Sequence, residues 1–392
     1  MTKPAILGGT PVRTAPWPKW PVWGDEERKG VLDVLESGQW GGYSDRVAAF
    51  EEAFGRLAGA RRCSAMANGT VTLISSLVAL GVRPGDEVIV PSYTFAATAN
   101  AVALAGATPV FADVEYATWN MDVAHAASLI TDRTRAIVPV HFAGHPVDMD
   151  PLMAVAVRHG IGVLEDAAHA PGSSWQGTAV GSLGHIASFS FQGFKNLTSG
   201  EGGAITTNDD ALAEAAWTHG NHGRDRDGSW YTHRKVGSNH RLTGFQAAIL
   251  LAALGRYEEQ LARRMAAGRY LRAALAGSGL TPAAWDERAE RHAHHLLPLH
   301  YDRLAFGGLD RADFALALIA EGIPCPTGYP VPLNRQPAFG GRPGECPVAD
   351  AACEDTVWIS QHLLLAEEGD LADIVEAVGR VRTHAAIIAA RS

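Results

Sequence analysis

Lysine is the least frequent charged residue in this 392-residue sequence, and cysteine is rarer still. Arginine therefore supplies nearly all of the positive charge. The four cysteines contain no C-x-x-C spacing, so the sequence indicates neither a redox motif nor a disulfide framework, and we expect reduced thiols. The five lysines are Lys3, Lys19, Lys29, Lys195 and Lys235.

Long apolar runs and an excess of positive charge are also missing. No run reaches the roughly 20 apolar residues that a membrane-spanning helix needs. The first residues, MTKPAILGGTPVRTAPWPKWP, contain no long apolar core before a cleavage site, so we expect no signal peptide. A formal net charge of −9 disfavours nucleic acid and anionic membrane as partners. These absences predict a soluble, cytoplasmic, globular protein.

From about residue 60, short apolar runs alternate with helical segments. Apolar positions between 71 and 80 predict a buried helix, and further helices are expected between several of the runs. Alternation of this kind predicts an α/β fold with a largely parallel sheet covered on both faces. Ligands in such folds gather beyond the carboxyl ends of the strands. The expected strands are 86–92, 107–114, 135–142, 161–166, 187–191 and 202–208.

Composition divides the chain into three predicted parts. Residues 1–24 hold five prolines and three tryptophans, which is typical of an extended arm. A large domain is expected over 25–255 and a smaller C-terminal domain over 256–392, linked by a helical run at 241–275. The smaller domain contains a predicted strand at 294–302 and helices at 310–322 and 370–387. Its Pro- and Gly-rich loop at 323–350 is predicted to be either functional or mobile.

Two ionisable residues stand at the ends of apolar strands. Asp166 follows Ile161–Leu164, and because an isolated buried carboxylate is costly, it either caps the next turn or has a functional partner. Lys195 lies between the strand ASFSF and a glycine-rich turn, next to Phe194 and Leu197. A surface lysine is the ordinary alternative, but an amine held against apolar groups loses its charge more easily and can attack a carbonyl.

The segment ANGT at 67–70 precedes the predicted buried helix. Gly69 and Thr70 would present free amides and the positive end of the helix dipole to a phosphate, although Asn68 or Thr70 could equally be a simple N-cap. Ser190 could add a hydroxyl to the same anion. An acid, an amine and an anion site together indicate pyridoxal 5'-phosphate (PLP), which needs a lysine Schiff base, an acid at its pyridine nitrogen and a phosphate cradle. Phe95 in PSYTFAAT offers an aromatic ring for the cofactor face.

Four longer stretches of the sequence resemble the motifs of a known protein family. PGDEVIVPSYTFAAT, VLEDAAHAPGSSWQGTAVGSLGHIASFSF, GFKNLTSGEGGAITTND and VGSNHRLTGFQAAIL resemble the signatures of the DegT/StrS-type sugar aminotransferases. The resemblance runs from about residue 16 to the C-terminus. Within the family it is strongest to the cyclitol branch, the L-glutamine:scyllo-inosose aminotransferases. The cues are NGTVTL, DEVIVPSYTF and Gln192, where many nucleotide-sugar relatives carry histidine.

The resemblance implies a type I, aspartate aminotransferase-like fold with a large mixed-sheet domain and a smaller C-terminal α+β domain. It implies a homodimer with shared active sites. Lys195 would bond covalently to the cofactor, Asp166 would pair with the pyridine nitrogen, Phe95 would stack on the ring, and His169 would lie near the phenolic oxygen. The phosphate contacts would come from Gly69, Thr70, Ser190 and, from the neighbouring subunit, Asn239 with Arg241 close by; Trp40 and Tyr329 would help shape the substrate pocket.

The expected reaction is transfer of an amino group from L-glutamine or L-glutamate to a keto-cyclitol or keto-sugar, as in aminoglycoside-like secondary metabolism. The sequence leaves the donor and the ketone open, and QGF before Lys195 is less common in the family, so the immediate substrate contacts are not assigned. A PLP-dependent sugar dehydratase is one alternative, but dehydratases of this family replace the lysine with histidine. A non-enzymatic regulatory protein on the same fold is the other.

Two further site types are disfavoured. The segment RHAHHLLPLH contains four histidines, but their spacing is typical of a strand, and no nearby cysteine or acid completes a zinc ligand set, so we expect no metal. GTAVGSLG at 177–184 does not match the G-x-G-x-x-G pattern of nicotinamide-binding enzymes.

Overall fold

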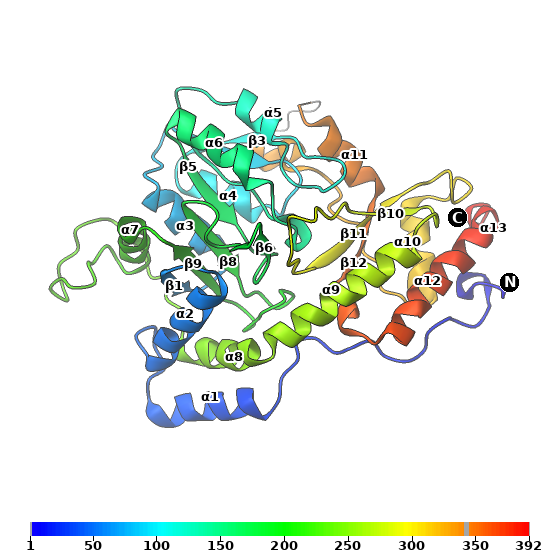
Figure 1. Ribbon diagram of the computed structural model, residues 1–392, viewed down its shortest axis with the longest axis horizontal. Coiled ribbons are helices and arrows are strands. Elements are labelled where there is room, and N and C mark those ends of the chain that lie inside the picture. Colours follow the sequence, from blue (N-terminus) through cyan, green and yellow to red (C-terminus); the bar gives the residue numbers. More distant parts are fainter. Residues whose placement is uncertain (1, 341–344, 392) are drawn as a thin grey trace.

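The computed structural model describes residues 2–340 and 345–391 and contains a seven-stranded sheet at its centre (Figure 1). The strand order is β1-β9-β8-β5-β4-β2-β3. β9 runs antiparallel to both of its neighbours, and the remaining pairs are parallel. The strands are β1 Arg62–Met66, β2 Glu87–Pro91, β3 Thr108–Ala112, β4 Thr134–Ile137, β5 Gly162–Asp166, β8 Ile186–Ser190 and β9 Gly203–Thr207, with a separate hairpin of β6 Ser174–Trp175 and β7 Thr178–Ala179.

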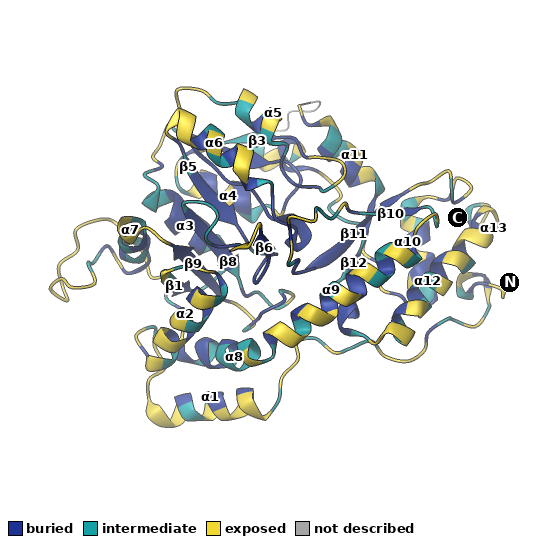
Figure 2. Cartoon of the chain, viewed as in Figure 1, coloured by how far each residue is buried: buried dark blue, intermediate teal, exposed yellow. Residues whose placement is uncertain are grey.

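Helices cover both faces of this sheet, because successive strand residues point to opposite sides. In β2, Val88 and Val90 pack with α3 and α4, whereas Ile89 packs with α5 and α6. Figure 2 shows the strands buried between these layers. The predicted α/β architecture is therefore correct. The helices of this domain are α1 Asp25–Ser37, α2 Asp45–Leu57, α3 Gly69–Ala79, α4 Ala97–Leu104, α5 Val123–Ser128, α6 Met149–His159, α7 Asp210–Gly220 and α8 Gly244–Gly255, with the short η2 Phe142–Gly144.

A second, three-stranded antiparallel sheet lies in the C-terminal part, in the order β10-β11-β12. The helical run expected at 241–275 is broken at Arg256, whose φ of −111° and ψ of 3° end α8 before α9 begins. The proposed boundary between the two domains falls at this break. The elements here are α9 Tyr257–Ala274, β10 Leu280–Pro282, β11 Leu296–Tyr301, α10 Arg311–Ala320, η3 Leu333–Arg335, η4 Pro337–Phe339, α11 Pro347–Asp355, β12 Thr356–Ser360, η5 Leu363–Leu365, α12 Glu368–Thr383 and α13 Ala385–Ala389. Residues 341–344 of the predicted loop at 323–350 lie outside the described residues.

The N-terminal arm has one short helix, η1 Ala5–Leu7, and otherwise extends along the C-terminal domain (Figure 1). Glu321 of the C-terminal domain accepts hydrogen bonds from the backbone N–H groups of Ala5 and Val12 at 2.8 and 2.9 Å. Further along, the Trp20 indole donates to the Gly193 carbonyl at 2.9 Å. The arm thus joins the C-terminal domain to the turn that carries Lys195.

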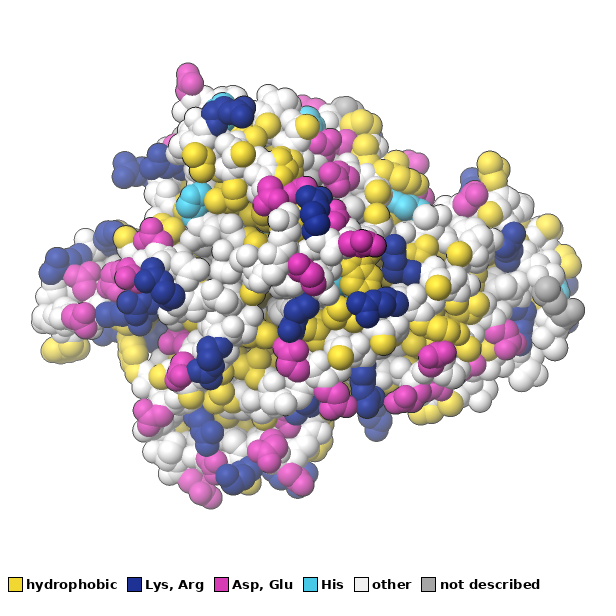
Figure 3. All heavy atoms as spheres, viewed as in Figure 1, with side chains coloured by type: hydrophobic (Ala, Val, Ile, Leu, Met, Phe, Trp, Pro, Cys, Tyr) yellow, Lys and Arg dark blue, Asp and Glu magenta, His cyan; other side chains and the backbone are white. Residues whose placement is uncertain are grey.

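On the face shown in Figure 3, basic and acidic side chains are interspersed over the whole surface. Among the described helices, none has both the length and the apolar composition to cross a membrane.

Candidate active site

Three of the predicted site residues, Asp166, Ser190 and Gly69, meet at the carboxyl ends of β5 and β8, which are adjacent parallel strands. Asp166 is the last residue of β5 and Ser190 the last of β8. The N-terminus of α3, at Gly69, packs directly on this edge: a Cβ added there would lie 2.8 Å from the Ser190 Cβ. Strand alternation directs Asp166 and Ser190 to the same side of the sheet as α3 and α4.

Asp166 is buried, with 5% of its surface exposed. Its Oδ2 accepts a hydrogen bond from Thr98 Oγ1 at 2.8 Å, and its Oδ1 accepts from the Ala168 N–H at 3.2 Å. Burial raises the pKa of this carboxyl group, which these two hydrogen bonds and the nearby Lys195 partly offset. The sequence left two alternatives for Asp166, a turn cap or a carboxylate with a functional partner. Oδ1 does close a turn. The carboxyl group still has no cation within ion-pair distance among the described residues, so a functional partner is compatible with the cap.

Lys195 lies in a turn, with its own N–H donating to the Gln192 carbonyl at 2.8 Å. Its side-chain amine makes no hydrogen bond or ion pair within the described part of the chain. Burial lowers the pKa of the amine to about 8, although the charge of Asp166 acts in the opposite direction. The neighbouring Phe194, expected to shield the amine, is instead 76% exposed, so the low polarity around Lys195 comes from other residues.

His169 is buried beside this pair. Its Nδ1 accepts a hydrogen bond from the Ala143 N–H at 3.3 Å, so in the neutral ring the proton is on Nε2. Burial, followed by the charge of Lys195, lowers the pKa of the imidazole well below its usual value. A neutral His169 can therefore donate from Nε2 to an oxygen in the site.

The first turn of α3 offers backbone donors. Asn68 is the N-cap, and its side chain accepts a hydrogen bond from the Val71 N–H at 3.0 Å. The N–H groups of Gly69 and Thr70 have no hydrogen-bond partner among the described residues. Capping by Asn68 and anion binding by the next two amides are therefore compatible, which the sequence alone left open.

Other predicted residues lie at the margins. Phe95, between β2 and α4, is 62% exposed. Tyr329 packs against Tyr93, with 5.3 Å between ring centroids, and the Asp166 charge is one of the influences that raise its pKa. Trp40 packs on Phe245 rather than among these residues. Each of the three lies in or near a loop rather than within the sheet.

Asn239 is exposed, and its side chain accepts from the Arg241 N–H at 3.3 Å. Within the described chain it makes no hydrogen bond to Gly69, Thr70 or Ser190. It forms a β-bridge with Asn221 at the base of the segment 221–240, and this segment projects from the large domain after α7 (Figure 1). One chain by itself therefore does not bring Asn239 to the other predicted phosphate contacts.

Several neighbours of the site were missed from the sequence. Thr98 holds Asp166, and Trp20 and Gln361 hold the carbonyl oxygens of the two residues before Lys195. Gln361 accepts in turn from the fully buried Arg264 at 2.6 Å. None of these residues has a sequence signal of its own, because their roles depend on contacts between segments that are far apart in the chain.

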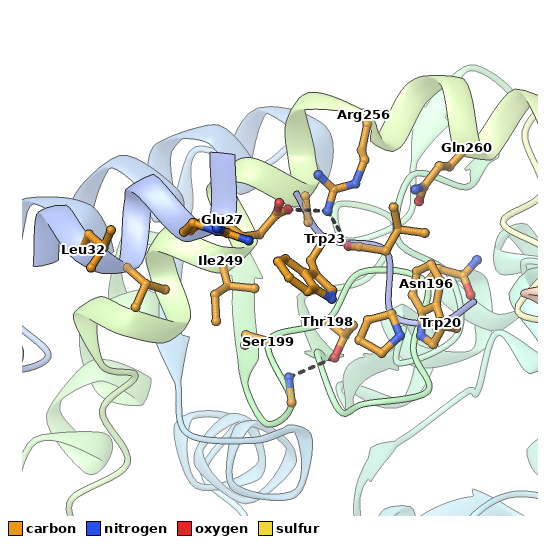
Figure 4. A pocket seen from close by; sticks show the side chains of 16 residues that line it. Trp20, Trp23, Glu27, Leu32, Asn196, Thr198, Ser199, Ile249, Arg256 and Gln260 are labelled. Atoms are coloured by element: carbon orange, nitrogen blue, oxygen red, sulfur yellow. Dashed lines mark hydrogen bonds and ion pairs between the residues drawn. The ribbon is translucent and has the colours of Figure 1, made fainter. Parts of the chain in front are cut away.

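A cavity of about 530 Å³ adjoins the Lys195 turn (Figure 4). Its walls are mostly apolar, and none of them is Asp166, Lys195 or Gly69. The Arg256–Glu27 ion pair closes one side. The cavity is therefore separate from the predicted catalytic groups. Its lining includes Trp20 and Trp23 from the arm, Ile249 from α8, and Asn196, Thr198 and Ser199 after Lys195.

The residues present fit PLP. A protonated pyridine nitrogen would give the buried Asp166 the cation that it lacks. The free amides of Gly69 and Thr70 match a phosphate, and the Lys195 amine is poised to react with an aldehyde because its pKa is lowered.

The lowered pKa makes a direct prediction for the cofactor-free protein. With a pKa of about 8, about one Lys195 amine in ten is neutral at pH 7, against about one in three thousand at the ordinary value of 10.5. Labelling with trinitrobenzenesulfonate, followed by peptide mass spectrometry, should give a rate for Lys195 that rises with pH to a midpoint near 8. The lowered pKa of Lys195 also reduces the free energy of unfolding below pH 8, because the folded protein binds this proton less tightly than the unfolded chain does. This loss of stability disappears as the pH rises toward 10.5. A Lys195 midpoint near the ordinary lysine value of 10.5 would contradict the burial argument.

The fold consists of a mixed seven-stranded sheet and a small C-terminal domain. One edge of the sheet brings together an acid, an amine and a helix N-terminus. This combination defines a PLP-dependent enzyme of the type I fold. Residues 21–379 match the DegT/DnrJ/EryC1/StrS aminotransferase family, and the chain belongs to that family. It is a PLP-dependent aminotransferase.

Individual relatives agree with this assignment. The chain is 38% identical to a putative L-glutamine:3-amino-2,3-dideoxy-scyllo-inosose aminotransferase of Streptoalloteichus tenebrarius, over 97% of this chain and 98% of that one. It is 37% identical in sequence to 3-amino-5-hydroxybenzoic acid synthase. The crystal structure of that protein matches with a TM-score of 0.88, over 95% of this chain and 99% of that one. It is 34% identical to S. venezuelae DesV, whose structure was solved in complex with a ketimine intermediate. The TM-score is 0.83, over 91% of this chain and 94% of that one.

Proposed function

We propose that this aminotransferase moves an amino group from L-glutamine or L-glutamate to a keto-cyclitol or keto-sugar in the biosynthesis of an aminoglycoside-like secondary metabolite. The observation that carries the proposal is the similarity, over nearly the whole of both chains, to a relative named as a glutamine-dependent scyllo-inosose aminotransferase. The fold is compatible with this acceptor but is not evidence for it, because side chains in the pocket, rather than the fold, select the substrate.

Each residue at the strand ends has a proposed role. Lys195 is the covalent attachment point and the base that takes a proton from the substrate Cα, for which its lowered pKa suits it. Asp166 holds a proton on the pyridine nitrogen, and Phe95 supports the open face of the ring. When bound, PLP supplies an electron-withdrawing ring that stabilises negative charge at the substrate Cα.

The remaining roles concern binding. His169 donates from Nε2 to the phenolic oxygen, since its Nδ1 is engaged by Ala143. The amides of Gly69 and Thr70 and the hydroxyl of Ser190 hold the phosphate. Tyr329 shapes the substrate side of the site.

Half-reaction spectra test the substrate proposal. Addition of L-glutamine or L-glutamate to the PLP enzyme should remove the absorbance of the lysine-bound cofactor. Addition of scyllo-inosose or 2-deoxy-scyllo-inosose should then restore it. Recovery with a nucleotide-linked keto-sugar, and not with either free cyclitol, would assign the acceptor to the keto-sugar class. If a carboxylated ring ketone alone restores the spectrum, both the cyclitol and the sugar proposals are wrong.

The two alternatives from the sequence make different predictions. A dehydratase should not transfer nitrogen in this assay, and the presence of Lys195 argues against it. A regulatory protein should not complete either half-reaction. Family membership favours neither alternative.

We also propose that the enzyme works as a homodimer in the cytoplasm. The argument for the dimer is that Asn239 is exposed and, within one described chain, makes no hydrogen bond to Gly69, Thr70 or Ser190. Trp23 and Leu32, which line the cavity of Figure 4, add exposed apolar surface. Light scattering at micromolar concentration should give twice the mass of one chain, and a monomer with full activity would contradict the proposal.

A further inference from the structure

Two buried histidines from different domains are in contact beside Lys195. His169 follows β5 in the large domain, and His295 immediately precedes β11 in the C-terminal domain. Their ring centroids are 4.2 Å apart, with an angle of 35° between the planes. His295 is 8% exposed, and the roles proposed above do not use it.

Hydrogen bonds assign the proton on His295. Asn196, the residue after Lys195, donates from Nδ2 to the Ala293 carbonyl at 2.7 Å, so its other side-chain atom is the acceptor Oδ1. Oδ1 lies 3.0 Å from His295 Nδ1, which must therefore carry a proton and donate it. The second nitrogen of His295, Nε2, has no hydrogen-bond partner among the described residues and remains an acceptor in the neutral ring.

One residue connects the backbones around both histidines. Ala143 donates its N–H to His169 Nδ1 at 3.3 Å and accepts from the His295 N–H at 2.8 Å through its carbonyl. Its φ of 57° lies in the left-handed region, which an alanine rarely adopts. Such conformations persist where the surroundings hold them, and they occur often at active sites. The strained loop therefore fixes the two rings relative to each other.

We propose that His295 is a positioning residue for transamination. Its hydrogen bond to Asn196 holds the turn that carries Lys195, and its ring holds the His169 ring by direct contact. This inference rests on the proposed roles of Lys195 and His169, and it adds a residue of the C-terminal domain to the support of the site. His295 acts through these two residues and does not itself bond to substrate.

The role requires a neutral ring. Among the described residues, the charged and titratable groups that face His295 are Lys195, His169 and Arg264, and none of these three is an acid. Burial, then the charges of Lys195 and Arg264, lowers the pKa of His295 well below its usual value. Protonation at Nε2 would place a cation against His169 and Lys195, so the low-pH limb of activity should report on this position.

Three substitutions in the holoenzyme separate the two contacts. His295→Asn can still donate to Asn196 but lacks the ring, His295→Phe keeps a ring but cannot donate, and His295→Ala loses both. The readouts are kcat, the KM of the amino donor, and the pH midpoint of the absorbance of bound PLP, which needs no substrate. We expect His295→Ala to lower kcat about 10- to 100-fold, since misplacing a catalytic group has effects of this size, with KM changed less than about 3-fold. The spectroscopic midpoint should shift by about one pH unit, and His295→Asn, which restores only the hydrogen bond, should recover part of both losses.

His300→Gln is the matched control. His300 lies in β11 and has the same exposed fraction, 8%, but bonds to Asp355 at 3.0 Å and to the Tyr116 carbonyl at 2.6 Å, away from the site. It should lower the melting temperature while leaving kcat and the spectroscopic midpoint unchanged. If His295→Ala likewise changes only the melting temperature, the residue is merely structural and the proposal is wrong.

A double-mutant cycle tests the connection to Lys195. Asn196→Ala should reproduce the part of the shift that comes from the hydrogen bond, and the double variant should be no worse than His295→Ala alone, because both substitutions break the same hydrogen bond. Additive losses would overturn the route through Asn196, and so would full rescue by His295→Phe. The spectroscopic midpoint is independent of the ketone and the donor. A wild-type enzyme that binds PLP but uses neither proposed substrate would therefore refute the proposed function without deciding this inference.

Discussion

Replacement of Lys195 by alanine is expected to abolish transamination, with kcat lowered at least about 10⁴-fold, the upper range for loss of a single acid–base group. The variant should also lose the absorbance of covalently held cofactor. Borohydride reduction should leave PLP on the Lys195 peptide of the wild type and on no peptide of the variant. The physical reason is that the other four lysines all lie within the described residues, and none of them follows a strand at this edge of the sheet.

The fold should survive this change. The Lys195 amine has no hydrogen-bond or ion-pair partner in the described residues, so its removal leaves no protein group unpaired. Lys29→Ala is the control, because Lys29 is exposed on α1 in a 3.7 Å surface pair with Asp33 that contributes little stability. It should keep normal spectra and turnover. Normal turnover by Lys195→Ala would end the assignment of this residue.

Replacement of Asp166 by asparagine is the second large effect. The change keeps the shape of the side chain but removes the negative charge that would hold a proton on the pyridine nitrogen. Loss of one partner from a buried charge pair costs about 3–5 kcal/mol, which corresponds to a fall in kcat/KM of about 10²- to 10⁴-fold. Steady-state kinetics at saturating PLP would measure it, with melting temperature as a check on folding.

The adjacent Glu165 provides a matched contrast. It is fully buried, but strand alternation directs it to the opposite face, where it accepts from His141 Nε2 at 3.0 Å and from backbone amides that include Leu183 at 2.9 Å. Glu165→Gln should cost stability, about 1–3 kcal/mol for a buried donor left unpaired, while the folded enzyme keeps kcat within about 3-fold. Equal kinetic losses in both variants would mean that Asp166 has no special position.

Much of the architecture could be predicted from local sequence. The apolar runs located β2, β3, β4, β5, β8 and β9 because buried strands are short and rich in β-branched residues. β1, Arg62–Met66, was missed, since its first residues are polar and its pairing with β9 is visible only in the sheet. The break at Arg256 was also missed, because both flanking segments are good helix formers and only packing separates α8 from α9.

The chemistry of the site could be predicted where residue type and strand position coincide, as for Asp166, Lys195 and the Gly69–Thr70 turn. The supporting residues could not. Thr98, Trp20, Asn196 and His295 act through contacts across long separations in sequence, and a side chain of each type has many ordinary uses.

By itself the sequence determined the α/β class and the family, because these follow from hydrophobic periodicity and from motifs in a fixed order, and it supplied the proposal that Lys195 bonds covalently to PLP and Asp166 holds its proton. Only the tertiary structure decided that Asp166 rather than Glu165 faces the Gly69 turn. It also decided that the Lys195 amine is buried enough to have a pKa of about 8, and that His295 reaches the site from the second domain. The physical reason is that burial, strand direction and hydrogen-bond partners depend on how distant segments pack, which local sequence does not encode.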